Sequence, residues 1–305
     1  MLSYLLRRLV ISVPVLLAII IVSFFLMRFA PGGPFDREKV FPPAIEKNLR
    51  AQYHLDEPLA AQCLRYIGGL ATGDLGVSMK YPDLSVSEII AQSLPVSMVL
   101  GLLALAVALA VGLPGGIIGA VRKGAWPDHA TMTLAMMGIS VPTLVIGPLL
   151  ILLFSFRLAV FPSGGWGGAS QIVLPAVTLS APFAAYIARL ARSGMLEALN
   201  RDYIRTARAK GLSEAKVVLR HAIREALLPV ISFLGPAAAA VMTGSVVVEK
   251  IFDVPGMGKH FVNGALNRDY PLVLGCVIVY SILIVIFNLA VDLGYGILDV
   301  RVKYD

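Results

Sequence analysis

Long segments almost without charged side chains constrain this chain more than any other feature. Within lipid, a backbone segment must satisfy its own hydrogen-bonding groups, which limits membrane-spanning structure to helices and closed barrels. The segments are far longer than the ~9–11 residues of a barrel strand, and they reach the ~20 residues with which a helix crosses the hydrocarbon core. They lie near residues 9–30, 94–121, 130–156, 172–191, 228–248 and 272–298. The chain is therefore predicted to be an all-α, polytopic membrane protein with six transmembrane helices.

Composition and charge agree with this prediction. Of the 305 residues, 57% are apolar and only 15% are charged, against ~25% charged residues in soluble domains. The net charge of +7 is concentrated in short segments beside the predicted helices, which is typical of topology control and not of nucleic-acid binding. These segments are Arg7 and Arg8, Arg122 and Lys123, the loop 189–225, and Arg301 and Lys303. Six crossings place all four on one side, so the positive-inside bias predicts that both termini are cytoplasmic.

The same pattern divides the chain into three parts. Residues 1–30 are expected to hold a retained first transmembrane helix, because its apolar stretch exceeds the ~7–15 residues of a signal-peptide core. Residues 31–93 carry six basic and eight acidic residues and are predicted to form an external subdomain. Residues 94–305 form the predicted core domain, with the cytoplasmic loop 189–225 between its helices.

One short amphipathic helix is predicted inside the external subdomain. Asp56-Glu57-Pro58 places proline at a first helical turn, and apolar residues then recur at helical spacing. This apolar stripe, which is expected to pack on the membrane domain, consists of Leu59, Cys63, Ile67 and Leu70. We expect no disulfide between Cys63 and Cys276, because one lies outside and the other inside a membrane helix.

The loop 189–225 is the most informative part of the sequence. Asn200-Arg201-Asp202 offers capping residues for a short helix that runs to Lys210, and Gly211 is suited to a left-handed stop. Ser213 is a candidate N-cap of a second helix, and Leu212 can pack against Val217. Two short helices that meet at a glycine elbow could fit a groove on a partner protein. Alternatively, the basic residues of the loop only determine topology.

Two stretches of this loop resemble the coupling loop of ABC importer permeases of the dipeptide and oligopeptide type. They are Asp202-Tyr-Ile-Arg-Thr-Ala-Arg-Ala-Lys-Gly-Leu-Ser213 and Leu219-Arg-His-Ala-Ile-Arg-Glu-Ala-Leu-Leu-Pro229. Of the wider family's Glu-Ala-Ala-x3-Gly, only Ala207 and Gly211 match, a departure that is usual in the peptide branch. Further stretches, such as Ile251-Phe-Asp-Val-Pro-Gly-Met-Gly258, extend the resemblance over the whole chain and make it most similar to the B subunit of oligopeptide permeases.

The resemblance implies a fold, a set of partners and a docking site. The fold would be that of a type I (MetI-like) ABC importer permease in the bacterial inner membrane. A second homologous permease would complete the channel, two ABC ATPases would drive it, and a periplasmic or lipid-anchored binding protein would deliver the peptide. The residues that would couple to the ATPases are Arg205, Thr206, Ala207, Arg208, Lys210, Gly211, Leu212, Ser213 and Glu214.

No cofactor is expected in this chain, because the sequence has no Gly-x4-Gly-Lys-Ser/Thr phosphate loop. The stretch Gly256-Met-Gly-Lys259 lacks the required hydroxyl and the earlier glycine. ATP and Mg²⁺ would therefore be bound by the partner ATPases. Neither His-Glu-x-x-His nor Gly-x-Ser-x-Gly occurs, which argues against an intramembrane enzyme.

Several apolar segments are interrupted by proline or glycine, and these interruptions point to the translocation pathway. Proline and glycine leave backbone groups of a helix without hydrogen-bond partners, which a cavity or a neighbouring helix must then supply. Ordinary kinked packing is the alternative explanation. The candidate pathway residues are Ser140, Pro142, Pro236, Met242, Thr243 and Ser245.

Two other functions stay open at this level. A permease of the same family could carry nickel or glutathione, and an ion-coupled secondary transporter would need a buried carboxylate relay. Asp292 is the main ionisable residue expected within a span, whereas Glu249 and Lys250 are expected at an external helix end.

Overall fold

The structure, a computed structural model, describes residues 2–30, 43–242 and 244–298. The described residues are mainly helical and contain no strand, only an isolated bridge between Val77 and Ser85. Five helical segments in the described part of the chain are long and apolar enough to cross a membrane, or six if a bent helix pair counts as one span. The five are α1 (Leu2–Phe29), α4 (Val86–Val121), α7 (Ala169–Leu199), α11 (Leu228–Met242) with α12 (Val246–Ile251), and α14 (Tyr270–Leu298).

The predicted third span, 130–156, is a helix pair bent at Pro142 and not one continuous helix. The chain instead forms α5 (Trp126–Ser140), α6 (Thr143–Leu150) and the π-helix η1 (Ile151–Arg157), with a bend of 107° between α5 and the rest. Pro142 causes the break, because proline lacks the N–H for a helical hydrogen bond and disfavours helical backbone in the residue before it. Val141 is accordingly extended, at φ −89° and ψ 119°. α5 alone has 15 residues, a length of about 22 Å.

The chain forms two compact units. The first contains residues 97–255 and the chain from residue 284 onward, and the second contains residues 2–96 and 256–283. The helices α4 and α14 are each divided between the two units, at residues 96/97 and 283/284.

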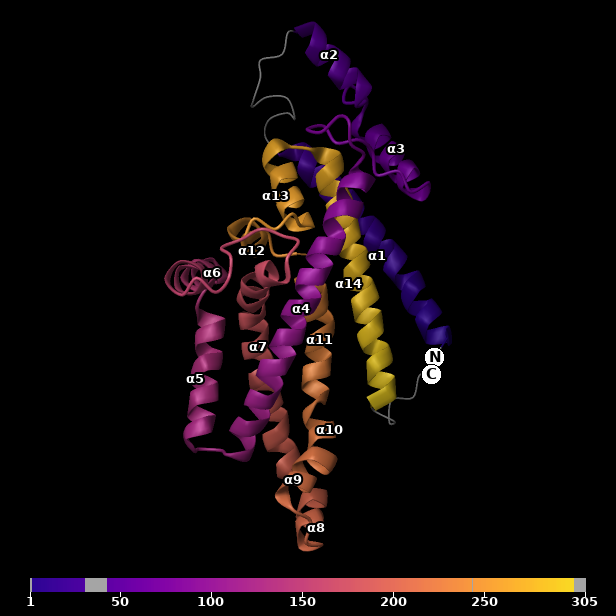
Figure 1. The fold of residues 1–305 in the computed structure, drawn as a ribbon. Helices are drawn as coiled ribbons and strands as arrows, with labels where there is room; N and C mark the ends of the chain where they lie inside the picture. The colour runs from indigo at the N-terminus through magenta and orange to yellow at the C-terminus, as the bar shows by residue number, and fades with distance from the viewer. Residues whose placement is uncertain (1, 31–42, 243, 299–305) are drawn as a thin grey trace. The chain divides into compact units, whose positions relative to one another are not determined.

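Helix α7 is the centre of the first unit, and α5, α6, α11 and the short α10 (Ile223–Ala226) pack against it (Figure 1). α4 also approaches it closely. A Cβ on Gly112 would meet the carbonyl oxygen of Ala184, and one on Gly116 would meet the carbonyl oxygen of Ala188 and, at 2.8 Å, the Cβ of Ala191. Small residues let membrane helices approach to backbone contact. The α4–α7 contact therefore leaves no room for larger side chains at these two glycines.

Replacing Gly116 by leucine should separate α4 from α7 and lower the stability of the protein by about 1–3 kcal/mol, as overpacking of a filled interior does. Thermal unfolding of the detergent-solubilised chain, followed by size-exclusion chromatography, measures the change. Gly68→Ala is the matched control, because a Cβ there meets no atom within 4 Å, and it should leave the midpoint unchanged or slightly raised. Equal midpoints for Gly116→Leu and the wild type would contradict the close packing.

The second unit contains the short amphipathic helix predicted after Pro58, and its presence is confirmed as α3 (Leu59–Ala71). Cys63 lies in the apolar stripe as expected, since it is buried in a cluster with Phe24 of α1 and Leu274 of α14. Cys63 and Cys276 are both free thiols, in separate clusters. The unit also contains α2 (Pro43–Gln52) and α13 (Met257–Asn267).

A buried carboxylate fastens a loop of this unit to the start of α14. Asp269 is fully buried and accepts hydrogen bonds from the Ser78 hydroxyl and from the backbone N–H groups of Met79, at 3.1 Å, and Lys80, at 3.2 Å. It also accepts from the backbone N–H of Leu272, at 3.3 Å, in the first turn of α14. Since each partner stabilises the ionised carboxylate, the burial of Asp269 is compensated.

Candidate functional site: the helical elbow at Gly211

The predicted pair of short helices that meet at a glycine is confirmed. α8 runs from Asp202 to Ala209, and Gly211 then adopts the left-handed conformation, with φ 75°. The backbone N–H of Gly211 donates to the carbonyl of Arg208 at 2.9 Å. The chain re-enters helical structure in α9 (Glu214–Lys216), followed by the π-helix η2 (Val217–Ala222) and α10. Glycine is required at the turn, because a side chain in left-handed backbone costs about 1–2 kcal/mol.

Two capping predictions turn out differently. Ser213 occupies the N-cap position of α9 with extended backbone, but its side chain makes no capping hydrogen bond. Asn200 does not begin α8: it is the C-cap residue of α7, and its side-chain amide donates to the carbonyl of Leu196 at 2.8 Å. Arg201 is the N-cap residue of α8, again without a side-chain cap.

An apolar cluster holds the elbow against the rest of the first unit. Ile204 and Ala207 of α8 are buried together with Val217 of η2 and Met195 of α7, and Leu212 packs against the same cluster, as predicted for its contact with Val217. Two of the nine candidate coupling residues, Ala207 and Leu212, therefore face the interior of this unit.

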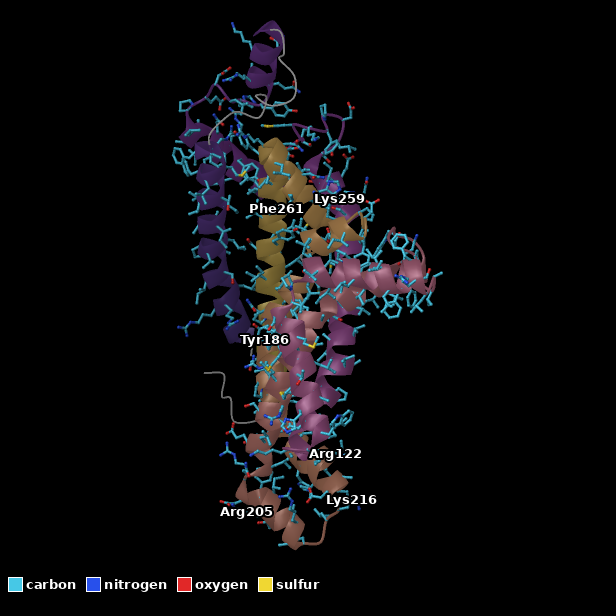
Figure 2. The ribbon with its side chains drawn as sticks, turned by 90° about the vertical axis from the view of Figure 1, so that its left-hand side faces the viewer. Arg122, Tyr186, Arg205, Lys216, Lys259 and Phe261 are labelled. Carbon is cyan, nitrogen blue, oxygen red and sulfur yellow. The ribbon has the colours of Figure 1, made fainter. Side chains whose placement is uncertain are left out.

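The other candidates are exposed and form a polar outer surface of the elbow. They are Arg205, Thr206, Arg208, Lys210, Gly211, Ser213 and Glu214. Arg208 and Glu214 form an ion pair across the turn, at 2.7 Å between Nε and Oε1. The hydrogen bond between them stabilises both charged forms, so the pKa of Glu214 is lowered and the pKa of Arg208 is raised. Figure 2 shows Arg205 and Lys216 at the same end of the unit.

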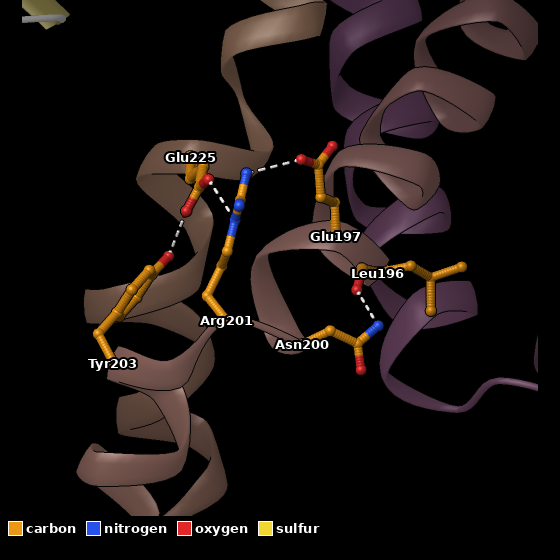
Figure 3. A network of polar contacts seen from close by, with 6 residues as sticks. All are labelled: Leu196, Glu197, Asn200, Arg201, Tyr203 and Glu225. Atoms are coloured by element: carbon orange, nitrogen blue, oxygen red, sulfur yellow. Dashed lines mark hydrogen bonds and ion pairs between the residues drawn. The ribbon is translucent and has the colours of Figure 1, made fainter.

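A polar network connects α8 to the two neighbouring helices (Figure 3). Arg201 donates to Glu197 of α7 at 2.7 Å and to Glu225 of α10 at 3.1 Å. The Tyr203 hydroxyl donates to the second oxygen of Glu225 at 2.6 Å. Burial, followed by the hydrogen bond to Glu225, raises the pKa of Tyr203 to about 12, so this hydroxyl stays protonated and remains a donor at physiological pH.

Glu225 therefore positions the elbow, a role that the sequence did not single out. It receives one bond from the N-cap residue of α8 and one from its first turn, while its own helix, α10, ends at Ala226, just before α11 begins at Leu228. Single exposed ion pairs contribute little, but bonds that converge on one carboxylate from two residues act together. No sequence signal distinguishes it, because Glu197, Asp202 and Glu214 are acidic residues of the same loop.

Replacing Glu225 by alanine should loosen α8 without unfolding the chain. Two hydrogen bonds to a half-exposed carboxylate are lost, which is worth about 1 kcal/mol locally, or about a fivefold faster amide exchange in residues 202–210. Hydrogen-exchange mass spectrometry measures this, with the exposed Asp83→Ala as control and Tyr203→Phe expected to give a smaller effect. Unchanged exchange in Glu225→Ala would show that the apolar cluster alone holds the elbow.

The candidate pathway residues differ in their exposure. Ser140, Pro142 and Pro236 have exposed side chains, whereas Met242 is buried. Ser245 is half-buried and caps α12 by accepting the Val248 N–H at 3.3 Å. Thr243 lies outside the described residues, as does the side chain of Asp292. An interruption of this span at Pro236 is not observed, since α11 continues through that residue, and the break lies instead between α11 and α12.

Glu249 lies near the end of α12, in agreement with the expected helix end. Its side chain is fully buried in the first unit, and its Oε1 accepts a hydrogen bond from the Ser97 hydroxyl of α4 at 2.7 Å. Gly244, at φ 89°, passes directly beside this pair, and a Cβ there would meet Glu249 Oε1 and, at 3.0 Å, Ser97 Oγ. A buried carboxylate therefore braces the break between α11 and α12.

Comparison with known proteins gives one family. The family described as the inner membrane component of binding-protein-dependent transport systems matches residues 112–304. The oligopeptide transport system permease proteins OppB of Haemophilus influenzae and of Escherichia coli are each 45% identical to this chain, over all of both chains. The dipeptide transport system permease protein DppB of Bacillus subtilis is 44% identical, over 99% of this chain and 98% of its own.

Solved structures agree on the fold. The inward-facing MetNI methionine ABC transporter aligns with a TM-score of 0.59 at 16% identity, covering 69% of this chain and 96% of the other. An identity this low supports the fold alone, which is the type I, MetI-like permease fold that the resemblance implied. The protein is thus a multi-pass inner membrane protein, and it belongs to the family of inner membrane components of binding-protein-dependent transport systems.

Proposed function

We propose that this chain is a permease subunit of an ATP-driven importer and forms, with a second homologous permease, the translocation channel for dipeptides and oligopeptides. The observation that carries this proposal is the 45% identity over the full chain to oligopeptide permeases. Relatives that are dipeptide permeases, at 44% identity, support the same cargo class. The likeness favours an ABC permease over an ion-coupled carrier.

The elbow at Gly211 is the proposed docking element for the ATPases. Its outer surface is polar and exposed, while Ala207 and Leu212 attach it to the apolar cluster of the unit. A force applied at Arg205 or Thr206 would therefore move α8 as a rigid piece and pass through Glu225 and the cluster into α7 and α10.

The proposed complex contains this chain, the second permease, two ABC ATPases and a periplasmic or lipid-anchored peptide-binding protein. ATP and Mg²⁺ would be held by the ATPases, and no cofactor by this chain. Both termini would be cytoplasmic. This orientation is supported by the positive-inside pattern, since the turn at Arg122 and Lys123 lies at the same end of the first unit as α8 (Figure 1).

The pathway is proposed to run beside the interrupted helices. Pro142 breaks the third span, and the α11–α12 break lies beside the buried Glu249. Their neighbours Ser140, Pro236, Met242, Thr243 and Ser245 stay the candidate residues. Few fixed charges along such a path would suit peptides with varied side chains.

Uptake of a labelled peptide series should require ATP when this chain is reconstituted with its permease, ATPase and binding-protein partners in vesicles. Dipeptides and oligopeptides should accumulate, and collapsing the proton gradient should have no effect, because ATP supplies the energy. Nickel chelates and glutathione serve as competing cargo. Uptake that persists without ATP and stops when the gradient is removed would instead identify a secondary transporter.

Charge reversal Arg205→Glu and the substitution Gly211→Pro should each uncouple ATP hydrolysis from uptake. The first changes an exposed side chain of the elbow. The second is incompatible with φ 75° and removes the N–H that bonds to Arg208. We expect at least a tenfold loss of uptake, since a lost charge-assisted contact is worth about 1.5–3 kcal/mol.

Membrane insertion and complex assembly are measured beside uptake, so that a folding defect is recognised. Arg157→Glu, at the exposed end of η1, is the matched charge reversal away from the elbow and should retain coupling. Full ATP-driven uptake by both elbow variants would rule out the proposed docking element.

A further inference from the structure

The second unit contains a cavity of about 350 Å³ that no part of the proposed transport mechanism uses. Its walls come from the last turn of α1, from α3, from the segments 52–54 and 74–79, and from the first residues of α14. A volume of this size lies in the range of small-ligand pockets, ~300–1,000 Å³.

Arg28 is the central residue of this cavity. Its guanidinium lies over the ring of Tyr270, at 4.4 Å from the centroid, and 5.3 Å from the ring of Phe24. Its Nε is buried and has no hydrogen-bond partner, and no described carboxylate forms an ion pair with it. Stacking occupies the face of a guanidinium, whereas its N–H groups point outward in the plane. The cation is therefore held by aromatic rings, and its Nε has no partner among the described residues.

Two further polar groups on the cavity wall lack partners. The Tyr66 hydroxyl is buried without a hydrogen bond, and burial raises its pKa, so it is a donor at physiological pH. Gln62 donates through Nε2 to the carbonyl oxygens of Glu57, at 2.7 Å, and of Leu55, at 3.2 Å. These two bonds determine which end of the amide is the oxygen, and this Oε1 has no partner. The residues that line the cavity thus carry two buried donors and one buried acceptor without partners.

The charged residues that line the cavity favour an anionic ligand. Among the described lining residues the only carboxylate is Asp74, and one of its oxygens already accepts the Gly76 N–H at 2.8 Å. Arg65, also in the lining, is paired with Glu57 at 2.6 Å. Within the described residues, Arg28 is left as a lining cation without a carboxylate partner, and a buried charge without a counter-ion is unfavourable. An anionic oxygen beside Arg28 and Tyr66 would remove this cost.

The surroundings of the cavity favour a lipid as the source of the anion. Leu26 and Phe29, on either side of Arg28 in α1, are 65% and 71% exposed, and Leu64 of α3 is 71% exposed. Leu26 and Phe29 belong to α1, which is long and apolar enough to span the membrane, where acyl chains would cover them. A headgroup in the cavity would therefore have its tails along α1.

We propose that this cavity binds the headgroup of an anionic phosphoglycerol lipid, with its phosphate on Arg28 and Tyr66 and a headgroup hydroxyl donating to Gln62. Arginine–phosphate contacts are strong, charge-assisted hydrogen bonds. The hydroxyl requirement distinguishes phosphatidylglycerol from phosphatidylcholine, whose headgroup has a phosphate but no donor for Gln62.

Native mass spectrometry of the full chain, delipidated in mild detergent and titrated with one lipid at a time, tests this proposal. Phosphatidylglycerol should bind in one copy at lower concentration than phosphatidylcholine. Arg28→Gln should weaken that copy about tenfold or more, and Tyr66→Phe, which keeps the ring, should weaken it several-fold. Arg122→Gln, an exposed arginine at another helix end, is the matched control and should not change it.

Glycerol 3-phosphate distinguishes a lipid from a free phosphate. It should compete with the lipid only weakly, because it lacks the acyl chains. If it binds as tightly as the lipid, the membrane source is wrong. Equal binding of phosphatidylglycerol and phosphatidylcholine to the wild type, or unchanged binding in both Arg28→Gln and the well-folded Tyr66→Phe, would overturn the site.

Discussion

The close packing of small residues around α7 is the constraint on which the first unit depends. α7 continues for 31 residues, although Pro175 and Pro182 lie within it. Inside a membrane helix, proline is tolerated where neighbouring groups satisfy the freed backbone. The Thr178 and Ser180 hydroxyls add bonds within the helix, to the carbonyls of Leu174 and Val177 at 2.8 Å each, which are not the carbonyls that the prolines leave without a donor. The helix that contains two internal prolines thus carries the elbow at its far end.

Buried charge is used in the protein to fasten elements together. Arg192 of α7 makes two bonds to Asp128 at the start of α5, at 2.6 and 2.8 Å, and Asp128 also accepts the Gly124 N–H. Asp269 fastens a loop to α14 in the second unit. In each case the charge has partners, because an unpaired charge in a dry interior is too costly to keep. Arg28 departs from this rule, which is why its cavity points to a ligand.

The sequence predicted most local features correctly because local chemistry decides them. Gly211 adopts the left-handed backbone that its position between two helical patterns required, and Pro58 precedes the short amphipathic helix as expected. The Ser213 cap failed for a different reason: the residue has the right backbone, but the turn is held by Arg208–Glu214 and the buried Leu212 instead. The angle at Pro142 could not be predicted either, because a proline predicts a break but not its direction.

The sequence by itself determined the membrane helices and the elbow, since both follow from hydropathy, charge and the backbone preferences of single residues. Only the tertiary structure decided which polar side chains are buried and which meet. Glu249 and Ser97 are 152 residues apart in the chain, and Arg28 meets the ring of Tyr270 from another helix. Contacts of this kind depend on how distant segments pack, and no local pattern records that. The bracing of the α11–α12 break and the cavity at Arg28 therefore emerge only from the folded chain.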